Sequence, residues 1–239
     1  MACCYYHPRE THVSLGIMNV HPDFFGRGLA KHLLAWILDF AKAQGKPVRL
    51  VSSALNLDSF SLYTRAGFVP VRAYQTMNLA VPDEGFAPAA EIGGAVREAR
   101  PQDAKAMADL EMELCGIRRE SDFAFFIENR QGIWGCSVLV GEGGAIDGFL
   151  ASVNDPGSNM LGPGVARTAG GAAALIAAEL DRRHRGLCPT FLAPADCPAL
   201  IQTLYGWGAR NSEIHFAQVW GKCPPMRGVN LPTFMPETG

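Results

Sequence analysis

The chain has 239 residues, of which 48% are hydrophobic and 18% charged, so it is long enough for one large or two ordinary domains and too apolar to be disordered. A formal net charge of −2 gives no excess of basic residues for binding nucleic acid or an anionic membrane, and we expect neither partner. The seven cysteines are scattered without zinc-ligand spacing, and no signal-peptide pattern follows Met1. We therefore expect no structural metal and a cytoplasmic location.

The first 81 residues are predicted to alternate strands and helices. Residues 12–20 read as an apolar strand, and after it Leu29, Leu33 and Ile37 recur at helical spacing, which predicts a helix over about 28–44. The next predicted elements are a short buried strand over 48–52, a helix over 56–65 and extended chain over 68–81.

A turn with two glycines, Gly26 and Gly28, joins the first strand to the first helix. Such a turn leaves the first N–H groups of the helix unpaired, beside the positive end of the helix dipole. Glycine also lets a ligand approach the backbone closely. The turn is therefore predicted to hold a phosphate or pyrophosphate, although a simple helix cap explains the glycines alone equally well.

Residues 82–95 are rich in proline, glycine and alanine and lack periodicity, so we predict a linker there between domains at 1–81 and 96–239. In the second domain we expect helices over about 101–115, 120–129, 170–185 and 197–206, and strands over about 133–140, 146–154, 159–166, 189–193 and 213–221.

The two domains repeat one pattern. Gly28 and Ala30 recur 142 positions later as Gly170 and Ala172, within the same order of strand, helix, strand, helix and strand. At this offset residue 1 matches residue 143, so 96–142 has no counterpart in the first domain. The first copy is thus predicted to lack a strand, two helices and at least one further strand.

A sheet shortened in this way has an unpaired edge and an uncovered apolar face. Three arrangements would account for it: the second domain covers the face, a homodimer partner covers it, or the chain begins inside a longer protein.

The segments VHPDFFGRGLA (20–30) and NLDSFSLYTRAGF (56–68) resemble the GNAT superfamily of acyl-CoA-dependent N-acyltransferases. The family's turn pattern is Q/R-x-x-G-x-G/A, which Gly28 and Ala30 meet, whereas Phe25 replaces the usual Gln or Arg. This departure removes one polar contact but leaves the backbone amides that hold the pyrophosphate.

The family's second signature is an asparagine, a tyrosine seven residues later and then Gly-Phe. Asn56, Tyr63 and Gly67-Phe68 meet it. The second copy carries Arg167-x-x-Gly170-x-Ala172, which fits the turn pattern. However, Leu204 lies opposite the tyrosine of the first copy and nothing in 190–200 matches its asparagine.

The chain thus resembles a tandem GNAT protein with a truncated first copy and a degenerate second copy. The fold implied is α/β of the α+β kind, with a mixed central sheet flanked by helices and an incomplete N-terminal copy. The resemblance also implies that acetyl-CoA is the cosubstrate and that no metal takes part. Its contacts are expected from Asn19, Val20, Phe25, Gly26, Arg27, Gly28, Leu29 and Ala30.

In this family Tyr63 corresponds to the residue that gives a proton to the departing thiolate, although a core tyrosine is the alternative. Asn56 is expected to bind cofactor or water, to cap the following helix, or to do both. No carboxylate lies in the strand 12–20, where many family members place the general base. His12, Glu10 and a water relay are the candidates, and both side chains also fit as surface residues.

The leading hypothesis is an N-acetyltransferase acting on an amine of a small molecule or peptide. The alternative is a non-catalytic acyl-CoA-binding or interaction protein of the same fold. Dinucleotide binding is disfavoured because GRGLA lacks the full GxGxxG pattern.

Overall fold

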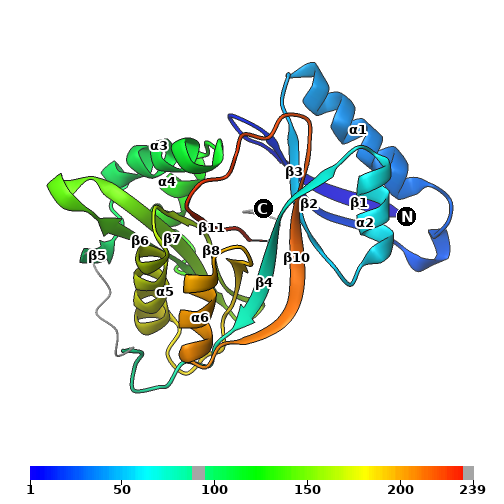
Figure 1. Ribbon diagram of the computed structural model, residues 1–239. Coiled ribbons are helices and arrows are strands. Elements are labelled where there is room, and N and C mark those ends of the chain that lie inside the picture. Colours follow the sequence, from blue (N-terminus) through cyan, green and yellow to red (C-terminus); the bar gives the residue numbers. More distant parts are fainter. Residues whose placement is uncertain (88–94, 234–239) are drawn as a thin grey trace.

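A computed structural model describes residues 1–87 and 95–233. Its strands form one mixed sheet in the order β1-β2-β3-β10-β4-β9-β8-β7-β6-β5, with β11 paired to β8 off this path (Figure 1). The pairs β2/β3 and β8/β9 are parallel, and the other neighbours in this order pair antiparallel. The expected fold class, a mixed central sheet flanked by helices, is confirmed.

We call residues 1–87 the first half and residues 95–233 the second half. The elements of the first half are β1 (Ala2–Pro8), β2 (Val13–Val20), α1 (Leu29–Ala43), β3 (Val48–Ser53), α2 (Leu57–Arg65) and β4 (Val69–Asn78). Those of the second half are β5 (Ala95–Glu98), α3 (Ala104–Cys115), α4 (Glu120–Glu128), β6 (Trp134–Val140), β7 (Ile146–Asp155), β8 (Ser158–Ala166), α5 (Ala169–Arg183), β9 (Thr190–Pro194), α6 (Pro198–Gly206), β10 (Arg210–Trp220) and β11 (Val229–Leu231).

The two halves exchange their last long strands. β4 of the first half pairs with β9 of the second, and β10 of the second half pairs with β3 of the first. β4 and β10 also pair with each other in the middle of the sheet, where they cross between the halves (Figure 1). The strands before and after the predicted linker at 82–95 therefore belong to one continuous sheet.

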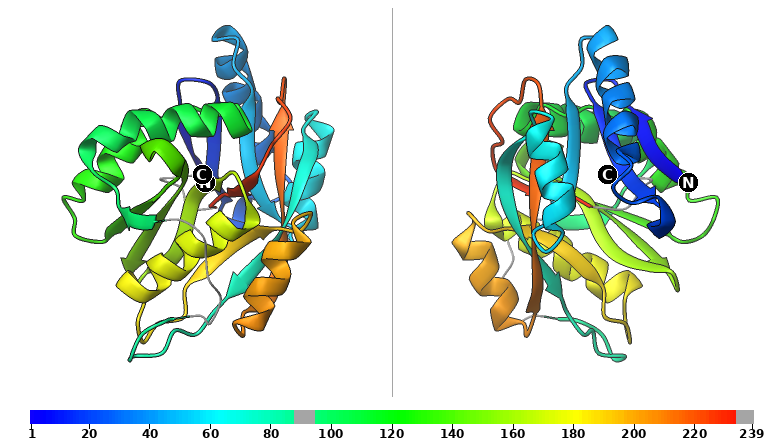
Figure 2. Two further views of the ribbon diagram at one scale, coloured as in Figure 1. Left: turned by 60° about the vertical axis from the view of Figure 1, so that its left-hand side comes forward. Right: turned by 90° about the vertical axis from the view of Figure 1, so that its right-hand side faces the viewer.

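Three apolar clusters hold the helices to this sheet. Helices α5 and α6 pack on one face of the second half and α3 and α4 on the other (Figure 2). In the first half, α1 covers one face through Leu34, Ile37 and Ala41, which are buried against Val13 and Leu50.

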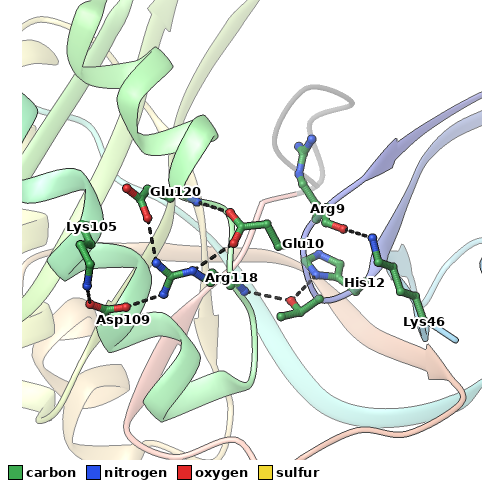
Figure 3. A network of polar contacts seen from close by, with 9 residues as sticks. Arg9, Glu10, His12, Lys46, Lys105, Asp109, Arg118 and Glu120 are labelled. Atoms are coloured by element: carbon green, nitrogen blue, oxygen red, sulfur yellow. Dashed lines mark hydrogen bonds and ion pairs between the residues drawn. The ribbon is translucent and has the colours of Figure 1, made fainter. Parts of the chain in front are cut away.

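The opposite face of the first half is covered by the second half, which is one of the three arrangements expected. In the turn between α3 and α4, the Arg118 amide donates to Thr11 Oγ1 at 2.9 Å, and the Arg118 guanidinium pairs with Glu10 at 3.0 Å. Figure 3 shows this network between the two halves. Arg9 pairs with Asp122 of α4 at 2.8 Å, so ion pairs as well as hydrogen bonds hold helices of the second half against the first half.

Candidate functional site

A gap between β2 and β3 is the central feature of the first half. The two parallel strands pair only at Val13–Val48 and Ser14–Arg49. Beyond this point β2 carries a bulge, since three steps from Leu15 to Met18 oppose two steps on β1. A bulge bends its strand, so β2 leaves β3 and stays paired with β1.

The gap opens into a cavity of about 630 Å³ beside the glycine turn. Seven of the eight residues expected to contact the cofactor line it: Asn19, Val20, Phe25, Gly26, Gly28, Leu29 and Ala30. Arg27 does not line it, and its guanidinium carbon lies 5.0 Å from the ring centre of Phe24. Both expected catalytic residues, Asn56 and Tyr63, line the same cavity.

The turn has the backbone that an anion seat requires. Gly26 and Gly28 both have φ of 75°, in the left-handed region that favours glycine. Gly28 is the N-cap of α1 and has no side chain to occupy the first amides of the helix. Lys31, in the first turn of α1, adds a cation to the cavity lining.

Tyr63 lies where this cavity meets a second one, of about 210 Å³, inside the gap. Its ring packs on Phe68, with 5.6 Å between ring centres, and the residue is 8% exposed. Burial, with a smaller effect of Cys4, raises the pKa of Tyr63 to about 12. The hydroxyl therefore keeps its proton at neutral pH and is able to donate it.

Asn56 is the N-cap of α2, because its Oδ1 accepts a hydrogen bond from the Ser59 amide at 3.1 Å. It also lines both cavities, so the cap leaves its amide group at the edge of the gap. The two expected roles of Asn56 are thus compatible in geometry.

His12 and Glu10 lie elsewhere. The expectation that His12 is a surface residue is wrong: it is 3% exposed and contacts Thr11 and Ser14 at 3.1 Å each. Burial, followed by Arg119, Arg49, Arg9 and Lys46, lowers the pKa of His12 to about 2, so it is a very weak base. Glu10 contacts Arg118 and the Glu120 amide at the α3–α4 turn (Figure 3).

Lys31, Ser59 and Thr233 are among the lining residues that were not anticipated from the sequence. Lys31 lies in the first turn of α1, three residues after Gly28, and Ser59 lies in the first turn of α2, three residues after Asn56. This closeness in sequence to expected site residues could have identified both. Thr233 of the second half lines the 210 Å³ cavity. No local pattern could have placed it there, since it reaches the site from more than 160 residues away.

The second half contains a similar gap that its own chain fills. β8 and β9 pair only at Met160–Thr190, and β11 pairs with β8 along Gly164–Ala166. Two residues, Arg167 and Thr168, join β8 to α5, and the Thr168 hydroxyl caps the Gly171 amide at 3.1 Å. The formal turn pattern at Gly170 thus lies inside the first turn of a capped helix.

The residues at the positions of Asn56 and Tyr63 also differ. Cys197, without a side-chain cap, is the N-cap of α6 at the position of Asn56 in α2. Leu204 is buried. The hydroxyl of the exposed Tyr205 donates a hydrogen bond to Gln75 Oε1 at 2.7 Å. The second half therefore lacks the arrangement found around Tyr63.

Within the described residues, no group of three or more His, Cys, Asp or Glu side chains is placed to hold a metal ion. None of the helices described combines the length and the apolar character that crossing a bilayer requires.

The family model described as "Acetyltransferase (GNAT) family" matches residues 1–68. No curated protein matches the chain. Among solved structures, a putative acetyltransferase from Pyrococcus horikoshii is 14% identical with a TM-score of 0.72, covering 100% of this chain and 76% of that chain. A GCN5-related N-acetyltransferase from Sphaerobacter thermophilus is 19% identical with a TM-score of 0.58, covering 95% and 78%.

A tandem GNAT protein from the clavulanic acid biosynthesis pathway is 15% identical with a TM-score of 0.58, covering 92% of this chain and 78% of that chain. At these identities the likeness establishes a common fold.

Proposed function

We propose that the protein transfers the acetyl group of acetyl-CoA to an amine of a small molecule or peptide, because residues 1–68 match the GNAT acetyltransferase family model. The observation that carries the proposal is the gap between β2 and β3. It joins a 630 Å³ cavity at a helix N-terminus to a 210 Å³ cavity, with Tyr63 at the junction.

The larger cavity suits the cosubstrate. The amides at the start of α1, together with Lys31, offer donors and positive charge to a pyrophosphate. Beyond Ser14, no pairing between β2 and β3 exists in the described residues, so the edge of β2 is free to bind an extended amide-containing arm as an added strand.

The smaller cavity suits the amine. Attack by the amine nitrogen forms the N–C bond, and the C–S bond then breaks as Tyr63 gives its proton to the leaving sulfur. The described lining of this cavity contains no Asp, Glu or His. We therefore propose that the amine loses its proton to water, and that neither His12 nor Glu10 acts as the base.

We further propose that the first half holds the single active site, in a cytoplasmic protein. Support for one site comes from β11, which occupies the gap in the second half, and from the cap on Gly171. The seven cysteines, all free, fit a reducing compartment.

Two measurements on the full chain test the proposal. Calorimetric titration with acetyl-CoA reports binding, and release of free thiol with a panel of amines reports turnover. Binding with turnover is expected. Binding without turnover on any amine would favour the non-catalytic acyl-CoA-binding alternative, and absence of binding would refute both.

A further inference from the structure

A third cavity, of about 60 Å³, lies on the face of β2 and β3 that points away from α1. His12, Ser14 and Arg49 line it, and each is less than 9% exposed. It shares Val51 and Thr233 with the 210 Å³ cavity, so the two are neighbours along β3.

Arg49 is the unusual group in this cavity. One of its nitrogens, Nη2, donates to the Cys115 carbonyl at 3.3 Å. Its Nε and Nη1 are buried and have no hydrogen-bond partner in the part of the chain that the structure describes. No carboxylate of residues 1–87 or 95–233 lies within ion-pair distance of it. A buried cation with two unpartnered nitrogens and no counter-ion is costly, so such a group indicates a missing anion.

The nearby Glu111 carboxylate, which attracts Arg49, is shared with a second cation. Arg119, which also lines the cavity, pairs with Glu111 at 2.7 Å. His12 is neutral, and no Asp or Glu belongs to the described lining. The cavity thus presents one positive charge in excess, which a single negative charge balances.

We propose that the acceptor is an amine that also carries a carboxylate, and that Arg49 binds this carboxylate in the 60 Å³ cavity while the amine lies in the 210 Å³ cavity beside Tyr63. The volume is about that of two water molecules, which fits a carboxylate. This inference rests on the proposed acetyl transfer.

The spacing along β3 limits the length of the acceptor. Arg49 precedes Val51 by two residues, or about 7 Å along a strand, and Val51 borders both cavities. A small amino acid with a short spacer between its two groups therefore fits better than a long polyamine. In the transfer its amine nitrogen gains the acetyl group and loses a proton, the C–S bond gives free CoA thiol, and the carboxylate stays ionised throughout.

Matched acceptors provide the test. Glycine, β-alanine and γ-aminobutyrate are each compared with the corresponding primary amide, which keeps the shape and removes the negative charge. For Arg49→Gln, the ratio of kcat/KM for acid over amide is expected to fall about 10- to 100-fold, the usual range for a hydrogen bond between charged groups. The acid and the amide differ in the basicity of their amines, but this difference affects the wild type and the variant equally. It therefore cancels when their acid-over-amide ratios are compared. Arg65→Gln, which removes an exposed cation from α2, is the control and keeps the wild-type ratio.

Thermal melting separates this proposal from the proposed function, because it requires no turnover. β-Alanine should raise the melting temperature of the wild type more than β-alaninamide does, and this difference should vanish in Arg49→Gln. It should persist even if acetyl-CoA fails to bind, which would refute only the transfer reaction. Equal effects of acid and amide on the wild type would overturn the proposal.

The free protein gives a second readout. Arg49→Met removes a buried, uncompensated charge and is expected to raise the melting temperature without ligand. A lower melting temperature would show that the charge is already compensated within the chain, and the proposal would then fail.

Discussion

Tyr63 is the residue whose chemistry can be isolated most cleanly. Tyr63→Phe keeps the ring that packs on Phe68 and removes only the hydroxyl of this residue, which lines both cavities. We expect kcat to fall about 10²- to 10⁴-fold, the range for a positioned acid, with little change in acetyl-CoA affinity. Steady-state kinetics and calorimetry give the two numbers. The control is Tyr205→Phe, which removes an exposed hydroxyl from α6, and an unchanged kcat in Tyr63→Phe would contradict the acid role.

Gly28 tests the anion seat. Gly28→Glu places a negative charge and a side chain at the start of α1, where φ is 75°, and should abolish acetyl-CoA binding in calorimetry. Gly45 ends the same helix with φ of 65° and has open space around it. Gly45→Glu therefore carries the same charge and a similar backbone strain but should bind normally. Equal acetyl-CoA affinity in the two variants would show that the glycine turn is not the pyrophosphate-binding site.

His12 predicts a dependence of stability on pH. Its pKa is about 2 in the folded protein, against an ordinary value of 6.5, so the unfolded chain binds more protons between these values. The free energy of unfolding therefore falls as pH falls through this window. From about pH 7 to about pH 5 the contribution of His12 is about 2 kcal/mol.

His12→Gln should reduce that loss by about 2 kcal/mol, measured by urea denaturation at the two pH values. His184, whose pKa burial lowers to about 4, offers a second variant with the same sign. An unaltered pH dependence in His12→Gln would mean that His12 is accessible to protons in the folded state.

At the level of elements, the two gaps in the sheet differ in what fills them. The gap at β2/β3 borders two cavities, whereas β11 pairs along β8 in the other, with Val229 and Leu231 buried. We expect calorimetry to give one acetyl-CoA per chain in the wild type and none in Gly28→Glu. A stoichiometry of two, or residual tight binding in the variant, would show that β11 leaves the second gap.

The elements that the sequence predicted are those with strong local signals. Helical spacing in α1 and the asparagine before α2 located both helices within one or two residues. β1, β5 and β11 were given no predicted range, because β1 is an edge strand of mixed polarity and β5 and β11 have only four and three residues. The burial of His12 was also missed, since Ile117 and Arg119, which line the same cavity, lie more than 100 positions away.

For the whole molecule, the repeated pattern indicated two copies but not the exchange of β4 and β10. Both strands have similar alternating patterns of apolar and polar residues. Such a pattern predicts which face of a strand is buried but does not predict which strand pairs with it. The sequence also could not show which segment covers the second face of the first half. Ion pairs such as Arg9–Asp122 form only when segments far apart in the sequence pack together.

The exchange predicts that the first half does not fold alone. Both neighbours of β4, which are β9 and β10, belong to the second half. Without them, buried side chains such as Tyr74 and Met77 would be exposed, each at a cost of about 1.5–3 kcal/mol. Residues 1–87 expressed alone should therefore lack a cooperative thermal transition, although they contain the whole family-matched segment.

Co-expression with residues 88–239 is the matched control, since it restores every strand neighbour while leaving the chain cut. The two fragments should co-purify and unfold in one transition that coincides by fluorescence and circular dichroism, because β4 and β10 each pair with strands of the other half. Independent folding of the first fragment, with acetyl-CoA binding of its own, would show that pairing of β4 and β3 with strands of the second half is dispensable. The site would then depend only on α1, α2 and the gap between β2 and β3.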